Sequence, residues 1–66
     1  MSDPRERWMK EHAHQEHYSC IAGFEADLAA HDDMLNEAYA VMDQYARIEL
    51  YTFVNKLLDE ATEGKS

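Results

Sequence analysis

The sequence predicts an all-α protein. Hydrophobic residues make up 45% of its 66 residues, too large a fraction for a disordered acidic tail. The only strong helix breakers are two glycines and one proline, and Pro4 and Gly64 lie close to the ends of the chain. The apolar residues recur at intervals of three and four, without the alternation of a strand. These observations predict two long helices forming one hairpin domain over residues 1–66.

The first helix is expected over residues 4–30. Asp3 can cap it, Pro4 suits its first position, and Glu6 stands where a capping box has a carboxylate. A glycine inside a helix costs about 1 kcal/mol relative to alanine. A break near 18–23, where Ser19 could cap a new helix and Gly23 weakens the old one, is therefore left open.

The second helix is expected over residues 34–62, after a turn at 31–33. Asp32 or Asp33 can cap this helix. The turn contains no glycine or proline, so one uninterrupted helix is the competing interpretation. The hairpin is favoured because the apolar seam of the first helix does not continue past Tyr45, where Glu49, Thr52 and Lys56 take its positions.

The second helix has apolar residues on two sides. One stripe runs through Leu35, Tyr39, Met42, Ala46, Leu50, Phe53, Leu57 and Ala61, and the other through Met34, Ala38, Val41, Tyr45 and Ile48. One partner helix cannot cover both stripes, so we expect a second copy of the chain to complete an antiparallel four-helix bundle. The residues predicted at this dimer or partner interface are Met34, Ala38, Val41, Tyr45, Ile48, Leu50, Phe53 and Leu57.

This plan resembles that of the Rop-type plasmid copy-number regulators, which are two-helix hairpins of about this length that dimerise into a bundle. The resemblance is one of architecture, and no functional motif aligns. The RNA binding that it implies is contradicted by the charge of this chain, described next.

The net charge is −8, from 14 acidic and 6 basic residues. Arg5, Arg7 and Lys10 are interspersed with acidic residues and form no basic cluster. Such a chain repels nucleic acids and anionic membranes, and a protein partner with a basic surface is expected instead. No apolar run reaches the ~20 residues of a membrane span and no signal peptide is apparent, so a cytoplasmic protein is predicted. The single cysteine agrees with this compartment.

A histidine-rich stretch precedes Cys20. On a continuous helix His14, His17 and Cys20 would share one face, with His31 further along it, and imidazole and thiolate groups suit zinc. The second helix offers no carboxylate on its main apolar face to complete such a site. We therefore expect no cofactor, with a zinc-binding helical bundle as the alternative. Titration of the histidines near neutral pH would make a pH sensor a further alternative.

No nucleophile, base and oxyanion-binding turn occur together, so an enzyme is not expected. Three aromatic residues at the edges of the predicted stripes are candidate partner anchors, because tyrosine and tryptophan are common at interface hot spots: Trp8, Tyr18 and Tyr51. The predicted function is a small acidic regulator that binds and inhibits another protein. Inhibitors from phages and plasmids that act on nucleic-acid-handling or transcription proteins provide the analogy. A structural oligomerisation subunit is the third hypothesis.

Overall fold

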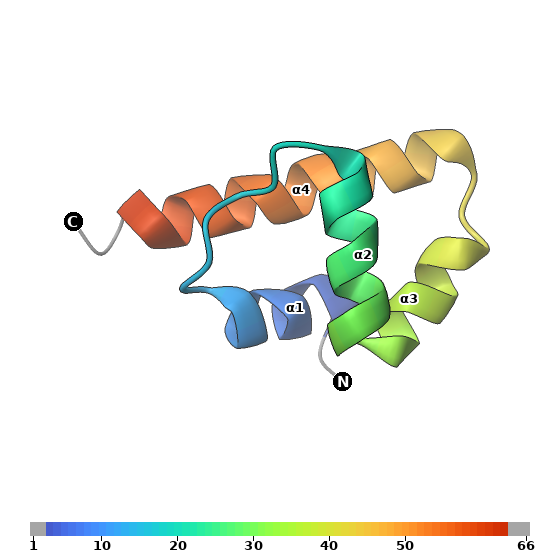
Figure 1. Ribbon diagram of the computed structural model, residues 1–66, viewed down its shortest axis with the longest axis horizontal. Coiled ribbons are helices and arrows are strands. Elements are labelled where there is room, and N and C mark those ends of the chain that lie inside the picture. Colours follow the sequence, from blue (N-terminus) through green and yellow to red (C-terminus); the bar gives the residue numbers. More distant parts are fainter. Residues whose placement is uncertain (1–2, 64–66) are drawn as a thin grey trace.

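A computed structural model of the protein describes residues 3–63, and helices are the only regular secondary structure in that range (Figure 1). The prediction of an all-α protein is confirmed. The helices are α1 (Pro4–His12), α2 (Ile21–His31), α3 (Asp33–Ala40) and α4 (Gln44–Glu63). The helices predicted over 4–30 and 34–62 are each interrupted, the first at 13–20 and the second at 41–43. Four helices therefore stand where the sequence predicted a two-helix hairpin.

The start of α1 agrees with its predicted cap. The Asp3 carboxylate accepts a hydrogen bond of 2.9 Å from the backbone N–H of Arg5, while Asp3 itself has extended backbone angles. A side-chain acceptor at this position satisfies one of the helix's unpaired N–H groups.

The interruption at 13–20 has a tertiary cause. The side chain of Asn55 in α4 accepts a hydrogen bond of 2.7 Å from the Tyr18 N–H and donates one of 3.0 Å to the Tyr18 carbonyl. The Tyr51 hydroxyl donates a further hydrogen bond of 3.2 Å to the same carbonyl. These contacts satisfy the backbone of Tyr18 as a helix would have done, so an extended conformation there leaves no polar group unpaired.

Asp32 forms the corner between α2 and α3, within the predicted turn 31–33. Its N–H donates to the Leu28 carbonyl at 3.0 Å, and its carboxylate accepts from the Leu35 N–H at 2.9 Å. Both carboxylate oxygens also lie 3.2 Å from the guanidinium of Arg7 in α1. The residue thus ends one helix, caps the next and ties both to α1.

Side chains also divide the second predicted helix. Asp43 caps α4 by accepting a hydrogen bond of 2.8 Å from the Ala46 N–H. Arg47 donates to the carbonyls of Tyr39 at 3.2 Å and Ala40 at 3.0 Å, at the end of α3. A cation suits the partially negative C-terminus of a helix, so Arg47 stabilises the point where α3 stops.

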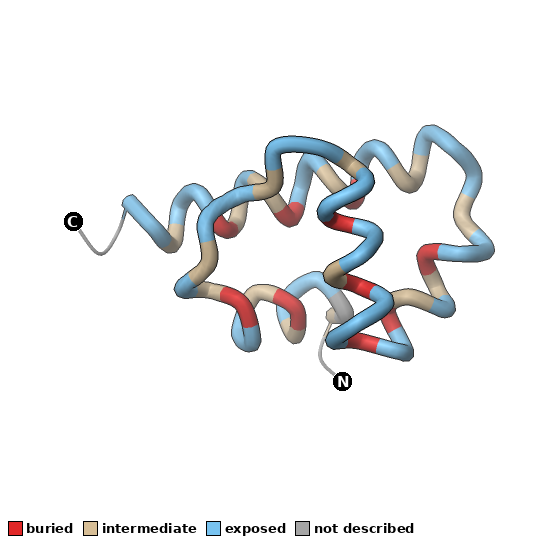
Figure 2. The backbone as a smooth tube through the Cα atoms, in the orientation of Figure 1, coloured by how far each residue is buried: buried red, intermediate tan, exposed pale blue. Residues whose placement is uncertain are grey.

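The core lies where α1 and α2 pack on α4 and where α3 packs on α2 (Figure 2). Phe24 is central, because its ring lies 5.8 Å from those of Trp8 and Tyr39 and 5.4 Å from that of Tyr18. The buried hydrophobic residues are Trp8, Phe24, Leu28, Leu35, Tyr39, Leu50, Val54 and Leu58. Each of the four helices contributes to this core. No helix within 3–63 is long and apolar enough to cross a membrane.

Candidate functional site

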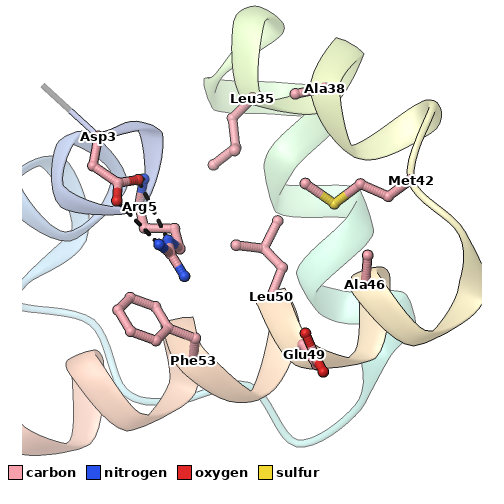
Figure 3. Close-up of a pocket in the computed structure, with 9 residues that line it drawn as sticks. All are labelled: Asp3, Arg5, Leu35, Ala38, Met42, Ala46, Glu49, Leu50 and Phe53. Atoms are coloured by element: carbon pink, nitrogen blue, oxygen red, sulfur yellow. Dashed lines mark hydrogen bonds and ion pairs between the residues drawn. The ribbon is translucent and has the colours of Figure 1, made fainter. Parts of the chain in front are cut away.

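An apolar groove of about 500 Å³ lies between α3 and α4, and we call it the α3–α4 groove (Figure 3). The small side chains of Ala38 and Ala46 contribute to its lining, one from each helix. One end is closed by residues at the start of α1. The lining residues are Asp3, Arg5, Leu35, Ala38, Met42, Ala46, Glu49, Leu50 and Phe53.

Arg5 closes the end of the groove at Phe53. Its guanidinium lies 4.4 Å from the centroid of the Phe53 ring and 3.1 Å from the Asp3 carboxylate. The hydrogen bonds from Arg5 lower the pKa of the Asp3 carboxyl, so this carboxylate stays charged beside the arginine. The charges of this pair offset each other.

Large apolar side chains project from the helices beside the groove. Met34 is 69% exposed, Val41 86% and Tyr45 82%, and Ile48 and Phe53 are also exposed. At about 100° per residue, Met34 and Val41 flank Ala38 on the outer side of the α3 wall, while Tyr45 continues the α4 wall. We call Met34, Val41 and Tyr45 the apolar rim.

Carboxylates stand beside the apolar rim. Glu37 lies three residues after Met34 and four before Val41, and Glu49 lies four after Tyr45, so each carboxylate neighbours a rim residue on its helix. Both are exposed, and neither forms an ion pair with any residue in the range 3–63. The groove is therefore apolar at its centre and acidic along both sides.

The predicted interface residues do not share one environment. The rim residues Met34, Val41 and Tyr45 are exposed, Ala38 and Phe53 line the groove, and Ile48 is exposed at the pocket between α2 and α4. Leu57 is half-buried. Leu50 is buried at the base of the groove as part of the chain's own core, so it is not a surface residue.

The three aromatic residues predicted as anchors do not project from the surface. Trp8 is fully buried, and its ring stacks on that of His12 with centroids 3.8 Å apart. Tyr18 and Tyr51 are half-buried against the core. The reason is the interruption at 13–20, which lets α1 pack along α4 and turns Trp8 inward.

A second pocket of about 470 Å³ lies between α2 and α4. Burial raises the pKa of the Tyr39 phenol, and the nearby Glu25 carboxylate raises it further. Arg47 lies over the Tyr39 ring, 5.2 Å from its centroid. The lining residues are Ile21, Glu25, Tyr39, Gln44, Arg47, Ile48 and Tyr51.

The candidate zinc ligands are not brought together. His14, His17 and Cys20 are exposed in the non-helical segment 13–20, so a spacing of three no longer places them on one face. His31 ends α2, where its Nε2 lies 3.2 Å from Asp27. Within 3–63 no group of three or more histidine, cysteine or acidic side chains is placed to hold a metal ion.

Asp27 is the centre of a polar cluster that was not predicted from the sequence. The Tyr18 hydroxyl donates a hydrogen bond to it, and the Nε2 of His12 lies 3.9 Å from it, with the His12 and His31 rings 5.6 Å apart. His12 is oriented by its Nδ1–H, which donates to the Trp8 carbonyl at 3.0 Å. The spacing of four residues between Asp27 and His31 could have predicted their contact on a helix. No neighbouring residue indicated that His12 or Tyr18 would also contact Asp27.

The chain was also compared with known proteins, and no protein-family model, curated protein or solved structure matches it.

Proposed function

We propose that this chain is a small acidic, non-enzymatic regulator that binds and inhibits another protein through the α3–α4 groove and its apolar rim. The observation that carries the proposal is the exposure of Met34, Val41 and Tyr45 beside an apolar groove. Exposed apolar patches bordered by polar residues are typical of protein interaction sites.

The distribution of exposed apolar residues supports one binding surface. In the described part of the chain, every exposed large hydrophobic side chain falls within residues 34–53. The other large apolar side chains of the helices are buried or half-buried. A chain that hides its apolar residues elsewhere, and leaves them on one pair of helices, favours a partner at that pair.

The charge favours a basic partner. The chain carries −8, and Glu37 and Glu49 beside the rim have no cation to neutralise them within 3–63. Complementary charge accelerates encounter and disfavours wrong partners. A nucleic-acid-handling or transcription protein has such a surface, and an acidic protein covering it would compete with the nucleic acid. We place this activity in the cytoplasm, where the exposed thiol of Cys20 would stay reduced.

A second copy of the chain would use the same surface if it formed the four-helix bundle predicted from the sequence. That dimer would bury the apolar rim of each copy. It would also bring together two chains that each carry −8, with Glu37 and Glu49 of both copies near the interface. A basic partner gains from these charges, whereas a second copy is repelled by them, so the basic partner is the occupant proposed.

Site-specific photo-crosslinking tests the proposal. A photoreactive amino acid replaces Val41 on the rim or, as control, the exposed Ala26 of α2, which lines neither pocket. We expect the Val41 position to capture a specific basic protein, identified by mass spectrometry. We also expect the purified pair to associate and the partner's activity to fall, with Val41→Glu abolishing both effects.

Three results would overturn the proposal. They are equal capture from both positions, capture of chaperones alone, and capture of a second copy alone. The last result would establish self-association as the role of the surface.

A further inference from the structure

We propose that the α3–α4 groove receives a single amphipathic helix of the partner, with basic residues on both sides of its apolar ridge. This inference rests on the proposed function and specifies the partner's binding element. It follows from the shape of the groove and the charges along its sides.

The shape of the groove suits a helix. Its walls are two helices that diverge from the 41–43 turn, with Met42 beside the turn and Phe53 beside Arg5 (Figure 3). Ala38 and Ala46 face it from the two walls and leave space for the side chains of a third helix. Apolar residues at every third or fourth position of an amphipathic helix form the ridge that such grooves bind.

The sides of the groove specify basic flanks. Glu37 stands beyond the rim on α3, and Glu49 lines the groove on α4. A helix lying along the groove would therefore meet a carboxylate on each side of its apolar ridge. Lysine or arginine on both flanks pairs with these carboxylates, while acidic flanks are repelled.

A displayed peptide library tests the composition of the occupant. The library fixes a helical apolar ridge and randomises the flanking positions, and the full-length protein is the bait. We expect selected peptides to carry lysine or arginine on both flanks, to lose affinity as salt is raised, and to fail against the Val41→Glu protein. Selection of acidic or extended peptides, or no enrichment over a Val41→Glu bait, would overturn the inference.

The failure of this inference can be told from failure of the proposed function. If crosslinking from Val41 identifies a basic partner that binds through a strand or loop, the regulator remains and the helical occupant is wrong. If crosslinking from Val41 identifies none, the proposed function itself is wrong.

Discussion

The hydroxyl of Tyr18 donates a hydrogen bond to the carboxylate of Asp27, joining the non-helical segment 13–20 to α2. The backbone of Tyr18 is held from the other side by Asn55 of α4, at 2.7 Å and 3.0 Å. Tyr18 therefore connects α2 and α4, which are separated along the chain by α3. The segment is fixed by specific polar contacts and by the packing of the Tyr18 ring on Phe24.

Tyr18→Phe should lower the free energy of unfolding by about 1 kcal/mol, because Asp27 loses a donor but keeps the nearby histidines. Burial, and then the hydrogen bond to Asp27, raise the pKa of Tyr18 well above 10.0. Above about pH 10 the unfolded chain releases this proton while the folded chain retains it. Stability should therefore fall as pH rises beyond that value, and less steeply in Tyr18→Phe.

Urea denaturation between pH 8 and pH 11, followed by circular dichroism, measures both effects. Tyr45→Phe is the matched control, because the Tyr45 side chain is exposed and the loss of its hydroxyl should leave the free energy of unfolding nearly unchanged. Parallel pH profiles for the wild type and Tyr18→Phe would show that Tyr18 does not retain its proton in the folded state.

Trp8→Ala should unfold most of the protein. Trp8 is fully buried and packs on His12 and Phe24, and truncating such a side chain costs about 3–5 kcal/mol. A chain of this size has little more stability than that to lose. Circular dichroism of the purified variant is the measurement, and a helical content equal to that of the wild type would mean that Trp8 lies at the surface.

Leu50→Asp and Tyr45→Asp should have different effects although both residues come from the predicted interface region. Leu50 is buried in the core, so an unpaired carboxylate there should cost more than about 3 kcal/mol and unfold the single chain. Tyr45 is exposed, so Tyr45→Asp should keep the fold and lose only partner binding. Thermal denaturation combined with the crosslinking assay distinguishes them. Equal loss of stability in both variants would contradict the exposure of Tyr45.

Gly23→Ala should stabilise the protein by about 0.5–1 kcal/mol, because alanine has less backbone freedom to lose in a helix. Gly23 lies inside α2, and an added Cβ would lie 3.8 Å from the Sγ of Cys20, an ordinary contact distance. Ala22→Gly, at the neighbouring exposed position, should have the opposite effect of similar size. Chemical denaturation of the two variants gives the comparison, and destabilisation by Gly23→Ala would indicate closer packing at this site.

The sequence predicted those features of the fold that depend on neighbouring residues. The Asp3 cap depends on residues within one helical turn, and the break at Asp32 falls inside the predicted turn 31–33. Leu35 and Tyr39 belong to the stripe predicted as core, and both are buried. Periodicity and capping chemistry carry this information directly.

The interruption at 13–20 overlaps the break near 18–23 that the sequence left open, whereas the interruption at 41–43 was not predicted. Distant or competing polar groups determine where both fall. Nothing near Tyr18 shows that Asn55, in the last helix, will bind both of its backbone groups. Asp43 and Arg47 are compatible with a continuous helix, and only the structure shows that they cap two separate ones. The sequence placed no break there because the segment contains no glycine or proline.

The candidate site was predicted in part. Met34, Val41 and Tyr45 came from the stripe that one partner helix could not cover, and they are exposed. The contribution of Arg5 was not foreseen, since the predicted hairpin gives no reason for the start of the chain to reach Phe53. The distinction between Leu50 as core and Phe53 as groove also required the observed position of α3.

Trp8 is an intrinsic fluorescent probe of the groove, because it belongs to the helical turn that carries Arg5 and Arg7. Arg7 of α1 pairs with Asp32 at the α2–α3 corner, and the next residue, Trp8, is buried in the core. Arg5, from the same helical turn, closes the groove. Trp8 is the chain's single tryptophan, so its fluorescence reports on this turn alone. A partner that displaces Arg5 would be detected as a change in tryptophan emission, without any added label.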